Sequence, residues 1–361
     1  MSPKLGIAVA LACCGLAFFS VSCSKNNGTT PTPSPTPSAS VGPDTVYIQD
    51  TGSKTIRSYR GGSTNNGIVA AKAVYPTSDG SQPDVVYSPL FDVLWVPSAY
   101  PLQNKGPVLN TPIRIWTAAS TKNAVNPDQT VPYSDGAGAA VYDATNDLLY
   151  VANIDGATIQ IYSTAHLMTA SSVAAANITL VITDGSILGT PRPIEMVLDS
   201  ATGRLFASDE GAVVAVFDNF AATAASAAAS HTNITVPANR EITALNQPDG
   251  MAYSPANDIL FIGEHNFKQI DVVHNASTFS GPQGHSQVIS GFGTGPTGLA
   301  YDAPRDLLFS YDPNNGQGGG VDVIPAPEVA SGNVNSIPNK RSFFDNLVPL
   351  SGFGITVDTT H

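Results

Sequence analysis

Acidic and amide side chains recur at two positions of an internal repeat, and they are the chain's candidates for chemistry. Asp84, Glu195 and Asp249 stand at the first position, where an apolar run begins. The second position follows the next apolar run and holds Asn153, Asp209, Glu264, His265 and Asp312. Oxygen atoms from separate repeats that converge on one point are the ligands that Ca²⁺ or another divalent cation prefers. The same residue types also hydrogen-bond within tight turns, so the pattern predicts either an acidic site or turn structure.

Other catalytic patterns do not occur in the sequence. It contains no G-x-S-x-G, no H-E-x-x-H and no C-x-x-C-H, which are the patterns of activated serine, zinc peptidase and haem attachment sites. Among the histidines, His265 alone stands beside the candidate acidic residues. We expect the others to face water on outer turns or strands; they include His166, His231, His274 and His285. Trp95 and Trp116 fall in strand patterns and are expected in the core.

Composition narrows the class of protein. The 361 residues include 28 Asp and Glu against 16 Lys and Arg, for a formal charge of −12, and only 12% are charged. Nucleic acid binding requires clustered Lys and Arg that displace phosphate counterions, so we exclude it. Because 42% of the residues are hydrophobic, the chain can bury a large core.

The N-terminus has the layout of an export signal. Lys4 precedes the apolar run Leu5–Phe19, which is short for a membrane span and leads into small residues before Cys23. This arrangement resembles a bacterial lipoprotein signal, with Ser20 in the place where that pattern usually has Leu. The resemblance implies cleavage before Cys23 and lipidation of that residue. Ordinary secretion and an uncleaved anchor are the alternatives. Ser24 resembles the sorting residue of outer-membrane lipoproteins.

Three segments follow from this interpretation. Residues 1–22 are expected to be a signal peptide, residues 23–43 a lipidated Cys with a Ser/Thr/Pro-rich linker, and residues 44–361 a folded domain. All three cysteines lie within the first 23 residues, so the folded domain has no internal disulfide. The linker contains TPTPSPTPS, a composition that favours an extended tether over a packed fold.

The folded domain repeats one phrase, in which two short apolar runs flank a turn rich in Asp, Asn and Gly. Its shared position recurs six times at intervals of 48 to 56 residues; the copies are Tyr87, Tyr142, Leu198, Tyr253, Tyr301 and Val357. A third, alternating apolar segment follows most copies, and a weaker fourth one comes after it. Four antiparallel strands repeated at this interval predict an all-β, six-bladed β-propeller.

The chain ends predict how the ring closes. The sixth copy stops after Gly354–Asp358, and unmatched strand patterns begin the domain at Thr45–Asp50 and Lys54–Tyr59. One C-terminal and three N-terminal strands would therefore complete the last blade and leave no exposed edge. The Ala-rich segment Ala221–Ser230 is expected to be a short outer helical turn or a loop.

The repeats resemble those of known propellers. YVAN at 150–153 followed by TIQIY at 158–162, and PDGMAYSP at 248–255 followed by DILFI at 258–262, resemble the YVTN and NHL-type repeats of bacterial exported propellers. They are also similar to the gluconolactonase and regucalcin group. That likeness implies a metal-dependent enzyme with Glu, Asn and Asp converging on the axis, for which Glu264, Asn153 and Asp249 have matching types. The group's N-terminal metal-binding Glu has no counterpart within Thr45–Asp50.

Two functions remain open from the sequence. The first is a lipid-anchored binding or scaffold module of the bacterial outer membrane, facing the periplasm or the cell surface. Its partner would be an envelope protein, a glycan or a small molecule. The alternative is a metal-dependent hydrolase, lactonase or lyase with its site in an axial funnel. No complete catalytic set supports the enzyme, so the binding module is favoured.

Overall fold

The structure is a computed structural model, and it describes most of the chain from residue 44 onward. The described residues are 44–77, 84–98, 111–133, 136–154, 156–183, 192–209, 211–314, 318–347, 350, 352 and 354–360. The predicted signal peptide and linker, with Cys23, lie outside them.

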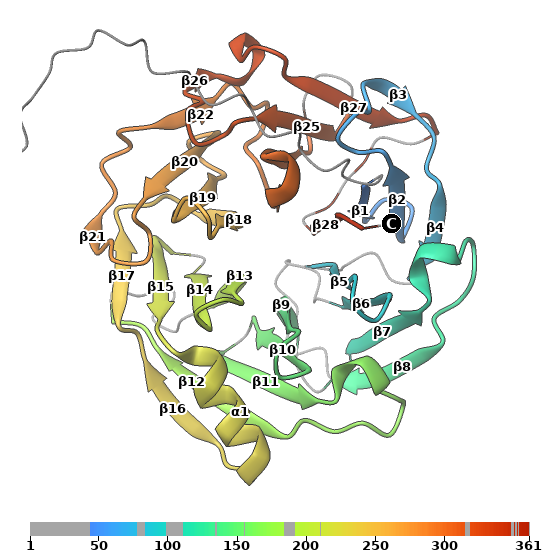
Figure 1. The fold of residues 1–361 in the computed structure, drawn as a ribbon, viewed down its shortest axis with the longest axis vertical. Helices are drawn as coiled ribbons and strands as arrows, with labels where there is room; N and C mark the ends of the chain where they lie inside the picture. Colours follow the sequence, from blue (N-terminus) through green and yellow to red (C-terminus); the bar gives the residue numbers. More distant parts are fainter. Residues whose placement is uncertain are drawn as a thin grey trace, which may run out of the picture. The chain divides into compact units, whose positions relative to one another are not determined.

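Six β-sheets form a closed ring around a central axis, which confirms the predicted six-bladed propeller (Figure 1). Blade 1 consists of β28 (Ile355–Asp358), β1 (Thr45–Asp50), β2 (Thr55–Arg60) and β4 (Ala73–Pro76), from the axis outward. Antiparallel pairing sets Val46 of β1 opposite Val357 of β28. The predicted closure of the last blade by one C-terminal and three N-terminal strands is therefore confirmed.

The other blades follow in chain order, and each begins with its innermost strand. Blade 2 comprises β5 (Val86–Ser88), β6 (Val93–Pro97), β7 (Thr111–Thr117) and β8 (Gln129–Tyr133). Blade 3 comprises β9 (Ala137–Asp143), β10 (Leu148–Asn153), β11 (Thr158–Ser163) and β12 (Ala176–Val181). Blade 4 comprises β13 (Pro193–Asp199), β14 (Arg204–Asp209), β15 (Val213–Phe217) and β17 (Arg240–Thr243). Blade 5 comprises β18 (Pro248–Ser254), β19 (Ile259–Glu264), β20 (Gln269–His274) and β22 (Val288–Ser290). Blade 6 comprises β23 (Gly298–Asp302), β24 (Leu307–Asp312), β25 (Gly320–Pro325) and β27 (Arg341–Asp345).

Four blades carry a fifth, parallel strand that the sequence did not indicate. The added strands are β3 (Gly67–Val69) on blade 6, β16 (Ile234–Pro237) on blade 3, β21 (Gly281–Pro282) on blade 4 and β26 (Gly332–Asn333) on blade 5. Each one directly precedes the outer strand of the next blade, so it joins neighbouring blades at the rim. They have two to four residues each and lie half-buried or exposed, which leaves too little apolar periodicity to detect.

The Ala-rich segment forms a longer helix than expected. Helix α1 spans Phe220–Ser230 and precedes β16. Alanine has the highest intrinsic helix propensity, and one face of α1 buries Phe220, Ala224 and Ala227 in a core cluster that also contains residues of blades 3 and 4. The segment is therefore helical, as one of the two expected alternatives had it, but it spans 11 residues instead of a single short turn.

The core lies between blades, not within them. Trp95 of blade 2 packs with Leu149 and Tyr162 of blade 3, and both Trp95 and Trp116 are fully buried as predicted. Each sheet therefore has apolar neighbours on both faces, which explains the apolar runs without alternation in strands such as β10.

A local hydrogen bond explains why the repeat phrase recurs. In four blades the repeat tyrosine donates its hydroxyl to the Asp five residues later, at 2.9 to 3.0 Å; the pairs are Tyr87–Asp92, Tyr142–Asp147, Tyr253–Asp258 and Tyr301–Asp306. These Asp residues have φ values of 51° to 52°, the left-handed conformation that Asp tolerates in turns. In blade 4, where Leu198 has no hydroxyl, Gly203 adopts the positive φ instead.

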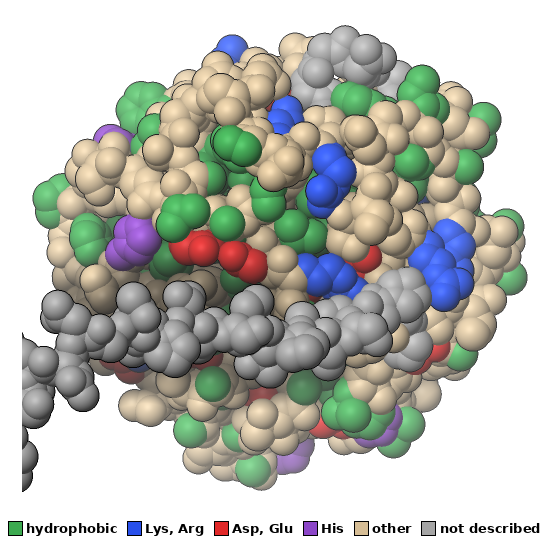
Figure 2. Space-filling model, turned by 45° about the horizontal axis from the view of Figure 1, so that its top comes forward, with side chains coloured by type: hydrophobic (Ala, Val, Ile, Leu, Met, Phe, Trp, Pro, Cys, Tyr) green, Lys and Arg blue, Asp and Glu red, His purple; other side chains and the backbone are tan. Residues whose placement is uncertain are grey.

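The face drawn in Figure 2 carries few charged side chains, scattered among polar and hydrophobic ones. Within the described part of the chain, no helix is both long enough and apolar enough to cross a bilayer.

Candidate functional site

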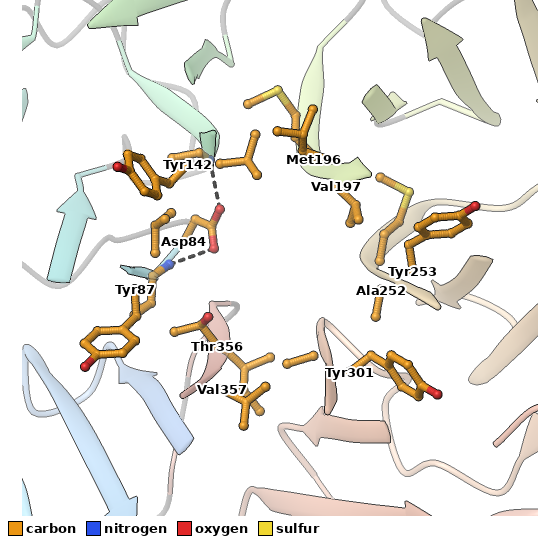
Figure 3. Close-up of a pocket in the computed structure, with 18 of the residues that line it drawn as sticks. Asp84, Tyr87, Tyr142, Met196, Val197, Ala252, Tyr253, Tyr301, Thr356 and Val357 are labelled. Carbon is orange, nitrogen blue, oxygen red and sulfur yellow. Dashed lines mark hydrogen bonds between the residues drawn. The ribbon is translucent and has the colours of Figure 1, made fainter. Parts of the chain in front are cut away.

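A channel runs along the axis of the ring, and the innermost strands of all six blades line it. Its cavity volume is about 380 Å³. Met196, Val197, Ala252 and Val357 present apolar atoms to the channel, while the repeat tyrosines are directed outward from its centre (Figure 3). The channel wall therefore combines these apolar side chains with polar atoms, and Asp84 and Glu195 are the ionisable carboxyl groups among its lining residues.

Asp84, a predicted site residue, lines this channel and is only 6% exposed. Its Oδ1 accepts a hydrogen bond from the Val85 backbone N–H at 2.7 Å, and its Oδ2 accepts one from Ala140 of blade 3 at 2.8 Å (Figure 3). Burial raises the pKa of Asp84 to about 7, although the two N–H groups oppose that shift by stabilising the carboxylate. Near neutral pH this carboxyl is thus divided between its protonated and ionised forms.

Glu195 lines the same channel from blade 4 and is half-buried. Its Oε1 accepts a hydrogen bond from the Met196 N–H at 3.0 Å. Burial raises the pKa of Glu195 well above its ordinary value, and repulsion from Asp84 and then from Asp249 raises it further. Two predicted carboxyl groups from different blades therefore interact within the channel.

Asp249 is paired with His265, so the structure brings these two candidates together. The Asp249 Oδ2 atom lies 3.2 Å from His265 Nδ1. Burial raises the pKa of Asp249, and the adjacent His265 ring opposes that shift. The neighbouring Asp249 carboxylate raises the pKa of His265.

Three candidates of the second repeat position make hydrogen bonds within loops. The buried Asp209 accepts from the backbone N–H of Arg192 at 3.2 Å. Asp312, also buried, accepts from Gly293 at 2.7 Å and from Asn314 at 3.0 Å. Asn153 is half-buried at the end of β10, where its carbonyl accepts from Gly156. The contact of Asp312 with Asn314 is local turn chemistry, whereas the bonds to Arg192 and Gly293 tie each strand end to the loop before its blade.

Glu264 belongs to a different group from the channel carboxylates. Among described His, Cys, Asp and Glu residues, one set places three ligand atoms within 4.8 Å of one another, and it is Glu264, Asp271 and His285. Sequence reasoning missed Asp271 and expected His285 to face water, but His285 Nδ1 lies 2.8 Å from Asp271 Oδ2. The available signal was Asp271 itself, a charged residue inside an apolar strand.

Comparison with known proteins supports the fold and nothing finer. No protein-family model and no curated protein matches the sequence. By contrast, 1093 chains of solved structures match, so the architecture alone does not select a function. One of them, from the crystal structure of a nidogen/laminin complex, is 10% identical and superposes with a TM-score of 0.53, over 89% of this chain and 100% of that chain. This likeness, together with the six sheets, shows that the chain has the β-propeller fold.

Proposed function

We propose that the protein is an exported, lipid-anchored binding module of the bacterial outer membrane, and that its axial channel takes a small organic cation. The N-terminal signal, Cys23 and the Pro-rich segment support export and anchoring. A solved propeller of similar fold comes from a nidogen/laminin complex, which supports binding as a role for this architecture.

The observation that carries the proposal is the pair of carboxyl groups, Asp84 and Glu195, in a partly apolar channel. An ionised carboxylate in such surroundings lacks the stabilisation that water provides. Here burial raises the pKa values of both groups, and repulsion from Asp84 raises that of Glu195 further. An ammonium group on an apolar ligand would supply the opposite charge, while its hydrocarbon part would contact Met196, Val197 and Ala252. The channel therefore favours amines over acids of similar size.

The expected result is amine binding that strengthens as the pH rises. Because the pKa of Asp84 is raised to about 7, the carboxyl is protonated at pH 5 and mostly ionised at pH 8. Because the carboxyl ionises less readily when folded, the folded state has its full stability below about pH 4 and loses part of it as the pH rises through 7. A bound amine would offset this loss. Isothermal titration with cyclohexylamine and cyclohexanecarboxylate, at pH 5 and pH 8, measures this difference.

Glu195→Gln should weaken amine binding at pH 8 by about tenfold, or about 1.4 kcal/mol, since it removes one of the two carboxyl groups that a bound ammonium would stabilise in ionised form. Asp128→Asn serves as the control because Asp128 immediately precedes β8, the outer strand of blade 2, and pairs with Lys122 away from the channel. Equal binding of the amine and the acid, or unchanged amine affinity in Glu195→Gln, would contradict the proposal.

Anchoring is tested at Cys23. Cys23→Ser removes the thiol that lipidation requires, so the protein should leave the membrane fraction of a bacterial host and lose palmitate labelling. Cys13→Ser and Cys14→Ser are matched controls because they change a thiol within the same signal. Membrane association that survives Cys23→Ser would indicate an uncleaved apolar anchor, and release of either control would show that Cys23 is not the modified residue.

A further inference from the structure

We propose that Glu264, Asp271 and His285 bind one divalent transition-metal cation, with Zn²⁺ as the best fit, between blades 4 and 5. Glu264 ends β19 and Asp271 lies on the neighbouring β20. His285 lies in the segment that joins β21, on the edge of blade 4, to β22 of blade 5. The site lies on different strands from the axial channel and does not depend on the function proposed above.

The ligand atoms have the spacing of a metal site. His285 Nδ1 lies 2.8 Å from Asp271 Oδ2 and 3.8 Å from Glu264 Oε2. Atoms bound about 2.1 Å from a tetrahedral zinc are roughly 3.4 Å apart, a value between these two separations. One imidazole nitrogen with two carboxylates suits Zn²⁺ and neighbouring transition metals, whereas Ca²⁺ and Mg²⁺ prefer oxygen ligands alone.

The Gln269 side chain completes the arrangement. Its Nε2 lies 2.9 Å from Asp271 Oδ1, 3.3 Å from His285 Nδ1 and 3.4 Å from Glu264 Oε2. The amide therefore reaches all three candidate ligands. A half-turn about its last bond would exchange Nε2 for Oε1, which is an additional ligand oxygen.

Two other blades place a positive charge at this position of the repeat. Glu264 and Asp271 stand at the end of the second strand and near the start of the third. The equivalent pairs are Asp50 with Arg57 in blade 1 and Asp312 with Asp322 in blade 6, as the hairpin registers show.

In blade 1 the positive charge is Arg57 itself, whose Nε lies 3.2 Å from Asp50. In blade 6 it is Lys340, whose Nζ lies 3.1 Å from Asp322 Oδ1. In blade 5, no Lys or Arg of the described chain pairs with Glu264 or Asp271, and their neighbours are an imidazole and an amide. A divalent cation would provide the charge that blades 1 and 6 obtain from Arg or Lys.

Burial makes this missing charge costly. The side chains of Glu264 and Asp271 are both 0% exposed, and two adjacent buried carboxylates repel each other strongly. His285 is 32% exposed, which gives an ion a route from solvent and leaves room for a water ligand. Its ring also contacts Phe267 edge-on, at a centroid distance of 5.4 Å.

The test is metal titration of the full chain after treatment with EDTA. Zn²⁺ binding is followed by calorimetry and thermal unfolding, and Co²⁺ binding by its visible absorption, with Ca²⁺ as the comparison ion. We expect one equivalent of Zn²⁺ or Co²⁺ at this site, a higher midpoint of unfolding with Zn²⁺, and no comparable effect of Ca²⁺.

His285→Ala should lower the Zn²⁺ affinity by roughly 100-fold, because the loss of even an outer partner of a metal ligand costs about 10- to 100-fold. Asp271→Asn, which keeps the size of the side chain, should give a loss of the same order. His274→Ala is the matched control: His274 ends the same strand β20 and is exposed. Circular dichroism confirms that each variant is folded. The proposal is overturned if no saturable Zn²⁺ binding occurs, if His285→Ala binds as the parent does, or if His274→Ala loses as much affinity.

Discussion

Deletion of residues 355–361 is expected to abolish the cooperative folding of the propeller. It removes β28, which pairs with β1 over Thr45–Ile48 and buries Ile355 in a cluster shared with blade 6. All six residues of β1 are buried, so the deletion exposes both an unpaired strand edge and apolar side chains such as Val46 and Ile48. Each fully buried aliphatic side chain contributes about 1.5–3 kcal/mol, and the sum approaches the total stability of about 5–15 kcal/mol of an ordinary domain.

Thermal unfolding followed by circular dichroism, together with soluble yield, measures this effect. The control is a chain that ends at Thr359, which keeps all of β28 and should unfold like the parent. A synthetic peptide of residues 352–361 should restore a cooperative transition to the truncated chain. If the chain without residues 355–361 melted within about 5 °C of the parent, a difference of roughly 1 kcal/mol or less, closure by this strand would not be what holds the ring.

Arg57→Met is expected to lower the free energy of unfolding by about 3–5 kcal/mol, the usual cost of removing one partner from a buried ion pair. The Arg57 side chain is 8% exposed and joins blade 1 to blade 6, with Nε 3.2 Å from Asp50 and Nη1 3.3 Å from Asp345. Tyr59 also donates its hydroxyl to Asp345 at 2.7 Å. Met fills a similar volume but leaves both carboxylates without the guanidinium charge.

Urea denaturation measures the difference. Arg60→Met on the same strand is the matched control because Arg60 is exposed, and it should change the stability by less than about 0.5 kcal/mol. Adding Asp345→Asn to Arg57→Met should recover part of the loss, since one uncompensated carboxylate is then removed. Equal stability of Arg57→Met and Arg60→Met would show that this network contributes nothing net.

The sequence by itself determined the number of blades and the way the ring closes. Both follow from local interactions: apolar runs that form strands, and a turn in which the repeat tyrosine hydrogen-bonds to an Asp only five residues away, as in Tyr87–Asp92. Each copy of the phrase carries this information within about 15 residues, so the repeat can be read without knowledge of its neighbours. The incomplete last copy then required strands from the other end of the chain, because a sheet edge left open at the rim of a ring is unfavourable.

Only the tertiary structure decided how the polar residues are used. Asp84 stands at the first repeat position and Asp312 at the second, and both are acidic. Asp84 nevertheless faces the axial channel, whereas Asp312 hydrogen-bonds to a loop. Arg57 and Asp345 are 288 residues apart in the chain and meet only where two blades pack. His285 likewise meets Asp271 only because β21 joins the edge of blade 4 before the chain enters blade 5. Charge compensation depends on which side chains of the adjacent blade come within a few ångströms, and periodicity along one strand carries no information about that.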